Sequence, residues 1–281
     1  MKKILLPTDF SNNAFHALTY ASELFKHEEC QFFVLNVFTE TKGFKSDSIE
    51  DAKERKLQNW KEEATTLLER FVNRIKKQGE NKKHTYRLLA ERKDLIQVII
   101  SLVDELNIDL IVMGNKGKKS SIPIFLGKTA TQTLQLVNKC AILTIPKNVL
   151  YTDPKQIAFV TDLKKSFTAK DVEPLIQIAL LNCTPIQIVH IDEKEQMNKS
   201  QQSNLDELLS FLKPIETTVH HVPDFVSKAK IIEIFIKETS IDMLVMVNNE
   251  HGFLEKMLRE PIIEKMVLNV DVPFLVIPEK A

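Results

Sequence analysis

The stretch "KILLPTDFS" at residues 3–11 has a counterpart of the same form, "QIAFVTDLK", at residues 156–164. Each is a short apolar run that ends in Thr-Asp. Apolar runs that are continuous rather than alternating are typical of strands buried on both faces of a parallel sheet. The two stretches therefore predict a buried strand that occurs twice in the chain.

Three further apolar runs also occur twice, in the same order along the chain. They are "FFVLNVF" (32–38) and "IQIVHID" (186–192), "IDLIVMG" (108–114) and "IDMLVMV" (241–247), and "AILTIP" (141–146) and "PFLVIP" (273–278). A repeat of this length indicates a duplicated domain, because solenoid repeats have periods of roughly 20–50 residues. We place the boundary in the polar segment "KNVLYTDPK" (147–155), which predicts domains at 1–149 and 150–281.

Segments with helical spacing separate these strands. Residues 11–26 begin with Ser11 in the capping position, and residues 94–107 begin with Asp94 and carry an apolar face of Ile96, Ile99, Ile100 and Val103. Residues 49–79 predict a long charged helix, whose counterpart near 203–213 is shorter. This alternation predicts an α/β fold with two tandem doubly wound domains, each with a five-stranded parallel sheet flanked by helices. Ligands bind at the carboxyl ends of such strands, where the strand order reverses.

Composition excludes several classes of partner. The 281 residues contain 38 lysines and arginines and 38 aspartates and glutamates, so net charge attracts neither nucleic acid nor an anionic membrane. The first apolar run is too short for a signal peptide, and we expect a cytoplasmic protein. The three cysteines are widely spaced, which favours reduced thiols over disulfides or a zinc site. No catalytic base is identifiable, so we do not expect an enzyme.

Three of the six glycines lie in "MGNKGKKSSIPIFLGKT" (113–129). The ending Gly-Lys-Thr suggests a P-loop, but Ile122 occupies the position of its first glycine, and the preceding strand is the fourth of its domain. The spacing is instead G-x2-G-x9-G, formed by Gly114, Gly117 and Gly127. The first two glycines allow sharp turns, and Gly127 precedes a helix that begins near Lys128. The pattern predicts an anion-binding loop.

This loop and the rest of the copy resemble the universal stress protein family, over the whole chain. The resemblance also rests on Pro7-Thr8-Asp9, on Val34–Val37, on "DLIVMG" (109–114) and on "CAILTIP" (140–146). It implies an adenine nucleotide alpha hydrolase-like fold and a stress-response sensor or regulator that binds ATP or a related adenine nucleotide. Mg²⁺ or Mn²⁺ would bind only with the nucleotide.

The resemblance also implies which residues bind the nucleotide in the first domain. Asp9 would recognise adenine and Val37 would contact the base, whereas Lys128 stands where the family usually has a Ser or Thr hydroxyl. The alternatives are purely structural roles, in which Asp9 is a helix N-terminal carboxylate and the glycines form a tight loop without ligand. The full predicted set is Pro7, Thr8, Asp9, Val37, Met113, Gly114, Lys116, Gly117, Gly127, Lys128, Thr129 and Ala130.

The second copy departs from this pattern. Asp162 matches Asp9, but Val247, Glu250 and Glu260 occupy the three glycine positions, so we expect no nucleotide there. His190 is interpreted as structural. The competing hypothesis is an interaction scaffold with an unidentified protein partner. It would self-associate through the terminal strands Ala141–Ile145 and Phe274–Ile277, as a domain pair or as a homodimer.

Overall fold

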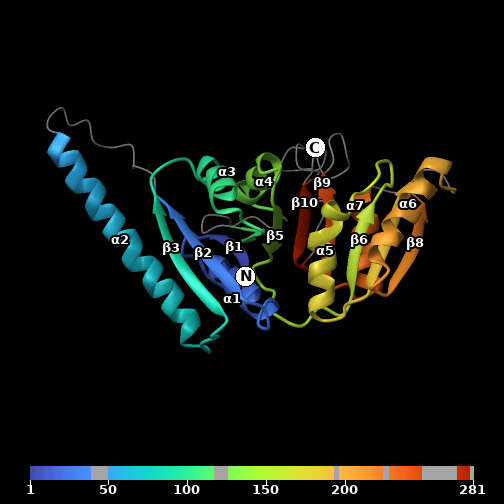
Figure 1. Ribbon diagram of the computed structural model, residues 1–281, viewed down its shortest axis with the longest axis horizontal. Helices are drawn as coiled ribbons and strands as arrows, with labels where there is room; N and C mark the ends of the chain where they lie inside the picture. Colours follow the sequence, from blue (N-terminus) through green and yellow to red (C-terminus); the bar gives the residue numbers. More distant parts are fainter. Residues whose placement is uncertain (39–49, 117–125, 193–195, 224–227, 249–270, 279–281) are drawn as a thin grey trace.

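In the computed structural model, which describes residues 1–38, 50–116, 126–192, 196–223, 228–248 and 271–278, ten strands form one continuous sheet (Figure 1). The strands are β1 (Lys2–Pro7), β2 (Cys30–Val37), β3 (His84–Glu91), β4 (Leu110–Gly114), β5 (Ala141–Ile145), β6 (Ile157–Thr161), β7 (Ile186–Asp192), β8 (Thr217–Pro223), β9 (Met243–Asn248) and β10 (Phe274–Pro278). The helices are α1 (Asn12–Leu24), α2 (Glu50–Lys76), α3 (Leu95–Leu106), α4 (Lys128–Leu136), α5 (Ala169–Leu181), α6 (Lys199–Leu212) and α7 (Lys228–Glu238).

The strand order is β3-β2-β1-β4-β5-β10-β9-β6-β7-β8. All pairs within β1–β5 are parallel, and so are all pairs within β6–β10. The order reverses between β1 and β4, and again between β6 and β9. The predicted tandem, doubly wound α/β fold is therefore confirmed. The boundary between residues 149 and 150 stays a prediction.

The terminal strands β5 and β10 pair with each other inside the chain, and this is an antiparallel pair. Leu143 lies opposite Leu275, and Thr144 lies opposite Phe274, whose carbonyl accepts a hydrogen bond from Thr144 Oγ1 at 3.4 Å. Each strand thus covers the edge of the other, as an isolated edge would require. Because the pair is antiparallel, the strands of the first half and those of the second half run in opposite directions. Their carboxyl ends therefore lie on opposite sides of the sheet, along the strand direction.

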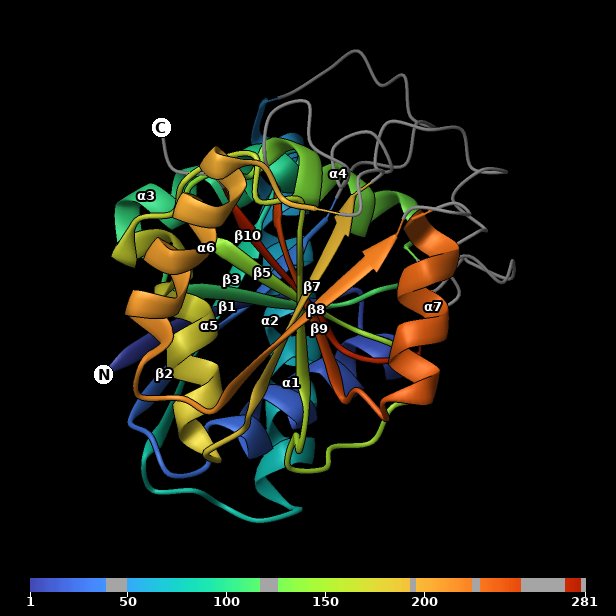
Figure 2. The same cartoon turned by 90° about the vertical axis from the view of Figure 1, so that its right-hand side faces the viewer.

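Helices cover both faces of the sheet, as Figure 2 shows for α5 and α6 on one side and α7 on the other. One buried apolar cluster joins the sheet to α1, α2, α5 and α6, with Phe15, Phe71 and Leu208 among its members. A second cluster joins the other face to α3, α4 and α7, through residues such as Ile99 and Leu134. The predicted continuous apolar strands are buried on both faces for this reason.

The helix caps agree with the sequence, and one predicted apolar face does not. Ser11 Oγ accepts a hydrogen bond from Ala14 N at 3.1 Å, and Asp94 caps α3 through Ile96 N at 3.0 Å. Ile100, which was predicted to face the core, is 40% exposed. Helix α3 instead faces the sheet with Val98, Ile99 and Leu102, which turns Ile100 toward the solvent. None of the described helices is long and apolar enough to cross a membrane.

Candidate functional site

The predicted site begins where β1 ends. Thr8 is buried, and its backbone N–H donates to the Leu35 carbonyl at 2.8 Å. Its own carbonyl accepts from Asn36 Nδ2 at 2.8 Å, and its Oγ1 accepts from Phe10 N at 3.0 Å. The backbone N–H, the carbonyl and Oγ1 of Thr8 all take part in holding this turn. Thr8 therefore has a local structural role at the end of β1.

Asp9 follows Thr8 and is exposed. Its Oδ1 accepts a hydrogen bond from Ser11 N at 3.0 Å, which ties the carboxylate to the turn that leads into α1. Phe10, between them, has a left-handed backbone with φ of 58°. The neighbouring Pro7 is buried, and Val37, at the end of the adjacent strand β2, is half-buried. The structure thus brings Pro7, Thr8, Asp9 and Val37 to one edge of the sheet.

The end of β4 lies beside the end of β1, because these two strands pair in parallel. Met113 is buried there, and Gly114 is the last residue of β4. The next residue, Asn115, donates its backbone N–H to Ile145 O at 2.9 Å and accepts from Gly127 N at 2.7 Å. The bond from Gly127 fixes the start of α4 next to the end of β4.

Helix α4 begins without a side-chain cap, since its N-cap residue is Gly127. The first bond within the helix runs from Thr131 N to Gly127 O at 2.9 Å. The N–H groups of Lys128, Thr129 and Ala130 therefore have no partner within the helix, and they lie at its positive end. Lys128 and Thr129 are exposed, and Ala130 is buried. The anion-binding potential resides in these three N–H groups, since Gly127 N–H is already bonded.

Three residues of the predicted pattern lie outside the described residues. They are Gly117, the second of the three glycines, and Glu250 and Glu260 of the second copy. Lys116 is described and is half-buried. The described part of the first-half site thus contains all the predicted residues except Gly117.

Sequence reasoning missed one residue at this site, Asn13. Its side chain is 4% exposed, and Nδ2 donates to Lys116 O at 2.8 Å and to Asn115 Oδ1 at 3.3 Å. A Cβ atom on Gly114 would lie 2.5 Å from Asn13 Nδ2 and 2.8 Å from its Cγ. The only signal in the sequence is an asparagine two residues after a capping serine, and this pattern does not specify burial.

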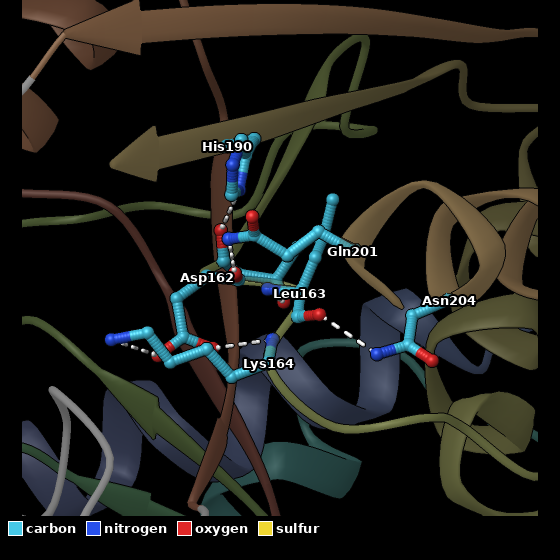
Figure 3. Close-up of polar contacts among 7 residues, drawn as sticks. Asp162, Leu163, Lys164, His190, Gln201 and Asn204 are labelled. Carbon is cyan, nitrogen blue, oxygen red and sulfur yellow. Dashed lines mark hydrogen bonds and ion pairs between the residues drawn. The ribbon is translucent and has the colours of Figure 1, made fainter. Parts of the chain in front are cut away.

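The second half repeats the turn after its first strand. Leu163 N donates to Thr161 Oγ1 at 3.1 Å, Lys164 N donates to Asp162 Oδ1 at 3.1 Å, and Leu163 has φ of 54° (Figure 3). These contacts match those of Thr8, Phe10, Asp9 and Ser11. The Asp turn is therefore kept in the half that lacks glycine at the position of Gly114. A carboxylate in this position has a local structural role that does not require a ligand.

The surroundings of this second turn are different. Gln201 Nε2 donates to Asp162 O at 3.1 Å, and Asn204 Nδ2 donates to Leu163 O at 2.8 Å (Figure 3). Asp162 also lies 3.9 Å from Lys164 Nζ. Helix α6 thus fastens the turn with two amides. The acidic side chain has a cationic neighbour from its own loop.

His190 lies behind the second turn and is fully buried. Its Nδ1 is 3.3 Å from Thr161 O, which only accepts, so this nitrogen carries the proton (Figure 3). His190 occupies the place of Asn36, which holds Thr8 O in the first half. The ring of His221 packs against His190 at 5.1 Å between centroids, whereas His220 contacts Phe235 on the other face. The position of His190 agrees with a structural role.

Metal and thiol chemistry have little support among the described residues. Within the described ranges, no group of three or more His, Cys, Asp or Glu side chains is placed to hold a metal ion. None of the three cysteines, all of which lie in the described ranges, is in a disulfide: Cys30 and Cys140 are buried, and Cys183 is exposed. Burial raises the pKa of Cys30 to about 11, which keeps it protonated and unreactive at neutral pH.

Comparisons with known proteins agree with this geometry. A model described as "Universal stress protein family" matches residues 1–144 and 178–278. "Universal stress protein MJ0577" of Methanocaldococcus jannaschii is 25% identical over 166 residues, covering 52% of this chain and 96% of that protein. A universal stress protein structure from Archaeoglobus fulgidus has a TM-score of 0.70 at 20% identity, and covers 98% of this chain and 96% of that one.

A structure of PA1789 from Pseudomonas aeruginosa, described as functionally unknown, has a TM-score of 0.58 at 12% identity. It covers 99% of this chain and 92% of that one. At such identities the two structural matches show the fold. Both extend across almost the whole chain, so they match the tandem arrangement and not one half only.

Proposed function

Because the chain belongs to the universal stress protein family, we propose that its first half binds ATP or a related adenine nucleotide. The nucleotide would lie at the carboxyl edge of β1 and β4, and the protein would act as a stress-response sensor or regulator in the cytoplasm. In this proposal the protein is not an enzyme, and Mg²⁺ or Mn²⁺ arrives with the phosphates.

One observation carries the proposal. The hydrogen bond from Gly127 N to Asn115 O, 2.7 Å long, fixes the uncapped start of α4 next to the end of β4. The strand order reverses between β1 and β4, which is where ligands bind in sheets of this kind. Three N–H groups and the positive end of a helix dipole there favour a phosphate. In this proposal Asp9, at the end of β1, would recognise the base.

Lys128 gives this site a different phosphate ligand from the family's hydroxyl. It is exposed, so its ammonium group would act as a point charge on the phosphates. An exposed interaction of this kind contributes about 0.2–1 kcal/mol, or a factor of roughly 1.5–5 in affinity. We expect ATP affinity to fall by that factor in Lys128→Ala and to depend on ionic strength. Lys170, exposed in the first turn of α5, provides the matched control.

The decisive experiment compares Asp9→Ala with Asp162→Ala in the full-length protein. Both variants remove the same turn contact, to Ser11 N in one half and to Lys164 N in the other. We therefore expect a similar loss of thermal stability. Calorimetry with ATP and Mg²⁺ should show binding to the wild type and to Asp162→Ala, and none to Asp9→Ala. A wild-type protein that shows neither heat nor thermal stabilisation with ATP or AMP would overturn the proposal.

The second half is proposed to bind no nucleotide. Val247 stands where the first half has Gly114, so the second half lacks glycine at the end of the matching strand. Gln201 and Asn204 already bind the carbonyls of the Asp162 turn. A stoichiometry of one nucleotide per chain is the expected result. A stoichiometry of two would contradict it.

The scaffold hypothesis remains the second candidate, and one observation favours it. The Asp turn persists in the half that we expect to bind nothing, so Asp9 has a purely structural explanation. The scaffold would bind its protein partner through surfaces that the paired strands β5 and β10 hold together. If Asp9→Ala leaves stress survival intact while disruption of the β5–β10 pair abolishes it, the scaffold is the better description.

A further inference from the structure

We propose that Asn13 is a positioning residue that sets the phosphate end of the first-half site. This inference rests on the proposed nucleotide binding and deepens it. Asn13 would not touch the ligand. It would act through the backbone of Lys116, which it holds against the start of α1.

The contacts of Asn13 all go to the segment after β4. Nδ2 donates to Lys116 O at 2.8 Å and approaches Asn115 Oδ1 at 3.3 Å. Asn115 in turn accepts the N–H of Gly127, at the start of α4. The Asn13 amide therefore joins α1 to the segment after β4, and the Asn115 carbonyl of that segment holds the start of α4. These are the elements that would surround the phosphates.

The amide is not satisfied by these contacts alone. Oδ1 of Asn13 is buried and accepts no hydrogen bond from the described residues. A buried acceptor without a donor is unfavourable and rare in native proteins, so its retention calls for a reason. A side chain that only filled space here could be apolar. The donor function of Nδ2 toward Lys116 O supplies the reason.

Gly114 is required by the amide itself. The nearest atoms to a Cβ on Gly114 are Asn13 Nδ2 at 2.5 Å, Asn13 Cγ at 2.8 Å and the Asn13 backbone carbon at 3.2 Å. The first glycine of the loop thus makes room for a side chain of α1. Gly114 and Asn13 therefore form one unit. A side chain added at Gly114 would displace the Asn13 amide, and loss of the Asn13 amide would leave empty space beside Gly114.

The second half lacks both members of this unit. The registers Ile4–Leu110 and Ile157–Met243 make Gly114 equivalent to Val247. Asn13 is the second residue of α1, and the second residue of α5 is Lys170, which is exposed. The shared turn of Asp9 and Asp162 survives without the pair, so the Asp turn does not need it. The pair is present only in the half where the start of α4 is expected to bind phosphate.

The position of Asn13 predicts a selective effect on affinity. Its contacts lie on the Lys116 side of the site, whereas Asn36 holds Thr8 O, on the Asp9 side. Loss of Asn13 should weaken binding of the phosphates and leave recognition of the base. Loss of Asn36 should disturb the base and affect every ligand that contains adenine.

The test measures the affinities of full-length wild type, Asn13→Ala and Asn36→Ala for ATP with Mg²⁺ and for adenosine, by calorimetry. We expect Asn13→Ala to lose up to about tenfold in ATP affinity, the factor that corresponds to one lost hydrogen bond, with adenosine affinity unchanged. Asn36→Ala, the matched control, should lose affinity for both ligands by the same factor. If Asn13→Ala weakens ATP and adenosine equally, or neither, the inference is wrong.

A second variant separates positioning from general loss of structure. Gly114→Ala should reproduce the selective loss of ATP affinity, because its methyl group displaces the Asn13 amide. In the Asn13→Ala background the same change should add little. Where Asn13→Ala does not fold, Asn13→Ser replaces it. A wild type that binds neither ATP nor adenosine would overturn the proposed function together with this inference, whereas normal wild-type binding with an unselective Asn13→Ala overturns the inference alone.

Discussion

Leu143 of β5 lies directly opposite Leu275 of β10, and both side chains are fully buried in the same apolar cluster. This pair joins two sets of parallel strands whose sequences repeat. Residues opposite each other in an antiparallel pair have neighbouring Cβ atoms on one face of the sheet. The two halves are therefore joined by regular β-sheet pairing and by a shared hydrophobic core.

The Leu143–Leu275 pair predicts energetic coupling across the junction. Each Leu→Ala change should cost about 2–5 kcal/mol in the free energy of unfolding. Because the side chains are neighbours, the double variant should differ from the sum by about 0.5–3 kcal/mol, measured by urea denaturation. Leu143→Ala combined with Leu68→Ala is the control, since Leu68 lies in α2, at the far edge of the sheet. Additive Leu143 and Leu275 effects would mean that the junction does not form in solution.

Three helices end with a residue in the left-handed region, which predicts a stabilising substitution. Asn107, Cys183 and Ser240 have φ of 51°, 52° and 50°, and the next residue in each case bonds back to the carbonyl five residues earlier. Glycine is the usual residue in this position, and asparagine is tolerated. Ser240→Gly should stabilise the protein by about 0.5–1 kcal/mol in thermal denaturation. Asn107→Gly should be nearly neutral, and an equal effect at both positions would refute this explanation.

His84 predicts that stability falls in mild acid. Its ring is buried, with Nε2 3.1 Å from Phe25 O and Nδ1 3.2 Å from Ser22 Oγ, and burial lowers the pKa of His84 below its ordinary value of 6.5. The unfolded chain then binds more protons than the folded chain below that pH. Stability is therefore complete above pH 6.5 and declines as the pH falls toward the lowered pKa.

The measurement for His84 is the free energy of unfolding at several pH values between 5 and 8, all within about two units of the ordinary histidine pKa. His84→Gln should flatten the decline, because glutamine does not titrate. His27→Gln is the control, since His27 is exposed, and its profile should match that of the wild type. A His84→Gln profile as steep as the wild type would assign the decline to other groups.

The hydroxyl of Tyr151, in the segment between the halves, is expected to stabilise the folded protein. Tyr151 donates to Asp153 Oδ1 at 2.6 Å, Lys26 Nζ lies 3.2 Å from the same oxygen, and the ring of Tyr151 packs on Tyr20 at 5.1 Å. Tyr151→Phe should cost about 0.5–1.5 kcal/mol in urea denaturation. In an Asp153→Asn background the cost should shrink, because the carboxylate is gone. An unchanged cost would show that the hydroxyl acts through another group.

The candidate site was predictable in part. The repeat, the caps of Ser11 and Asp94 and the short buried strands are local patterns, and they led to the correct fold. The meeting of Asp9 and Gly114 followed from the rule that parallel strands end at one edge. The hydrogen-bond partners of individual polar groups could not be predicted from the sequence. The N–H groups of Thr8 and Gly127 bond to the carbonyls of Leu35 and Asn115, and such pairings depend on residues far away in the sequence.

What the sequence by itself determined was the identity and order of the elements, because hydrophobic periodicity and capping act over a few residues. Only the tertiary structure decided that β5 and β10 pair with each other in one chain, which is a contact across 130 residues between Thr144 and the Phe274 carbonyl. It also decided what the glycine at 114 is for. A missing side chain looks the same in the sequence whether it admits a ligand or an amide, and the position of Asn13 shows that it admits the amide.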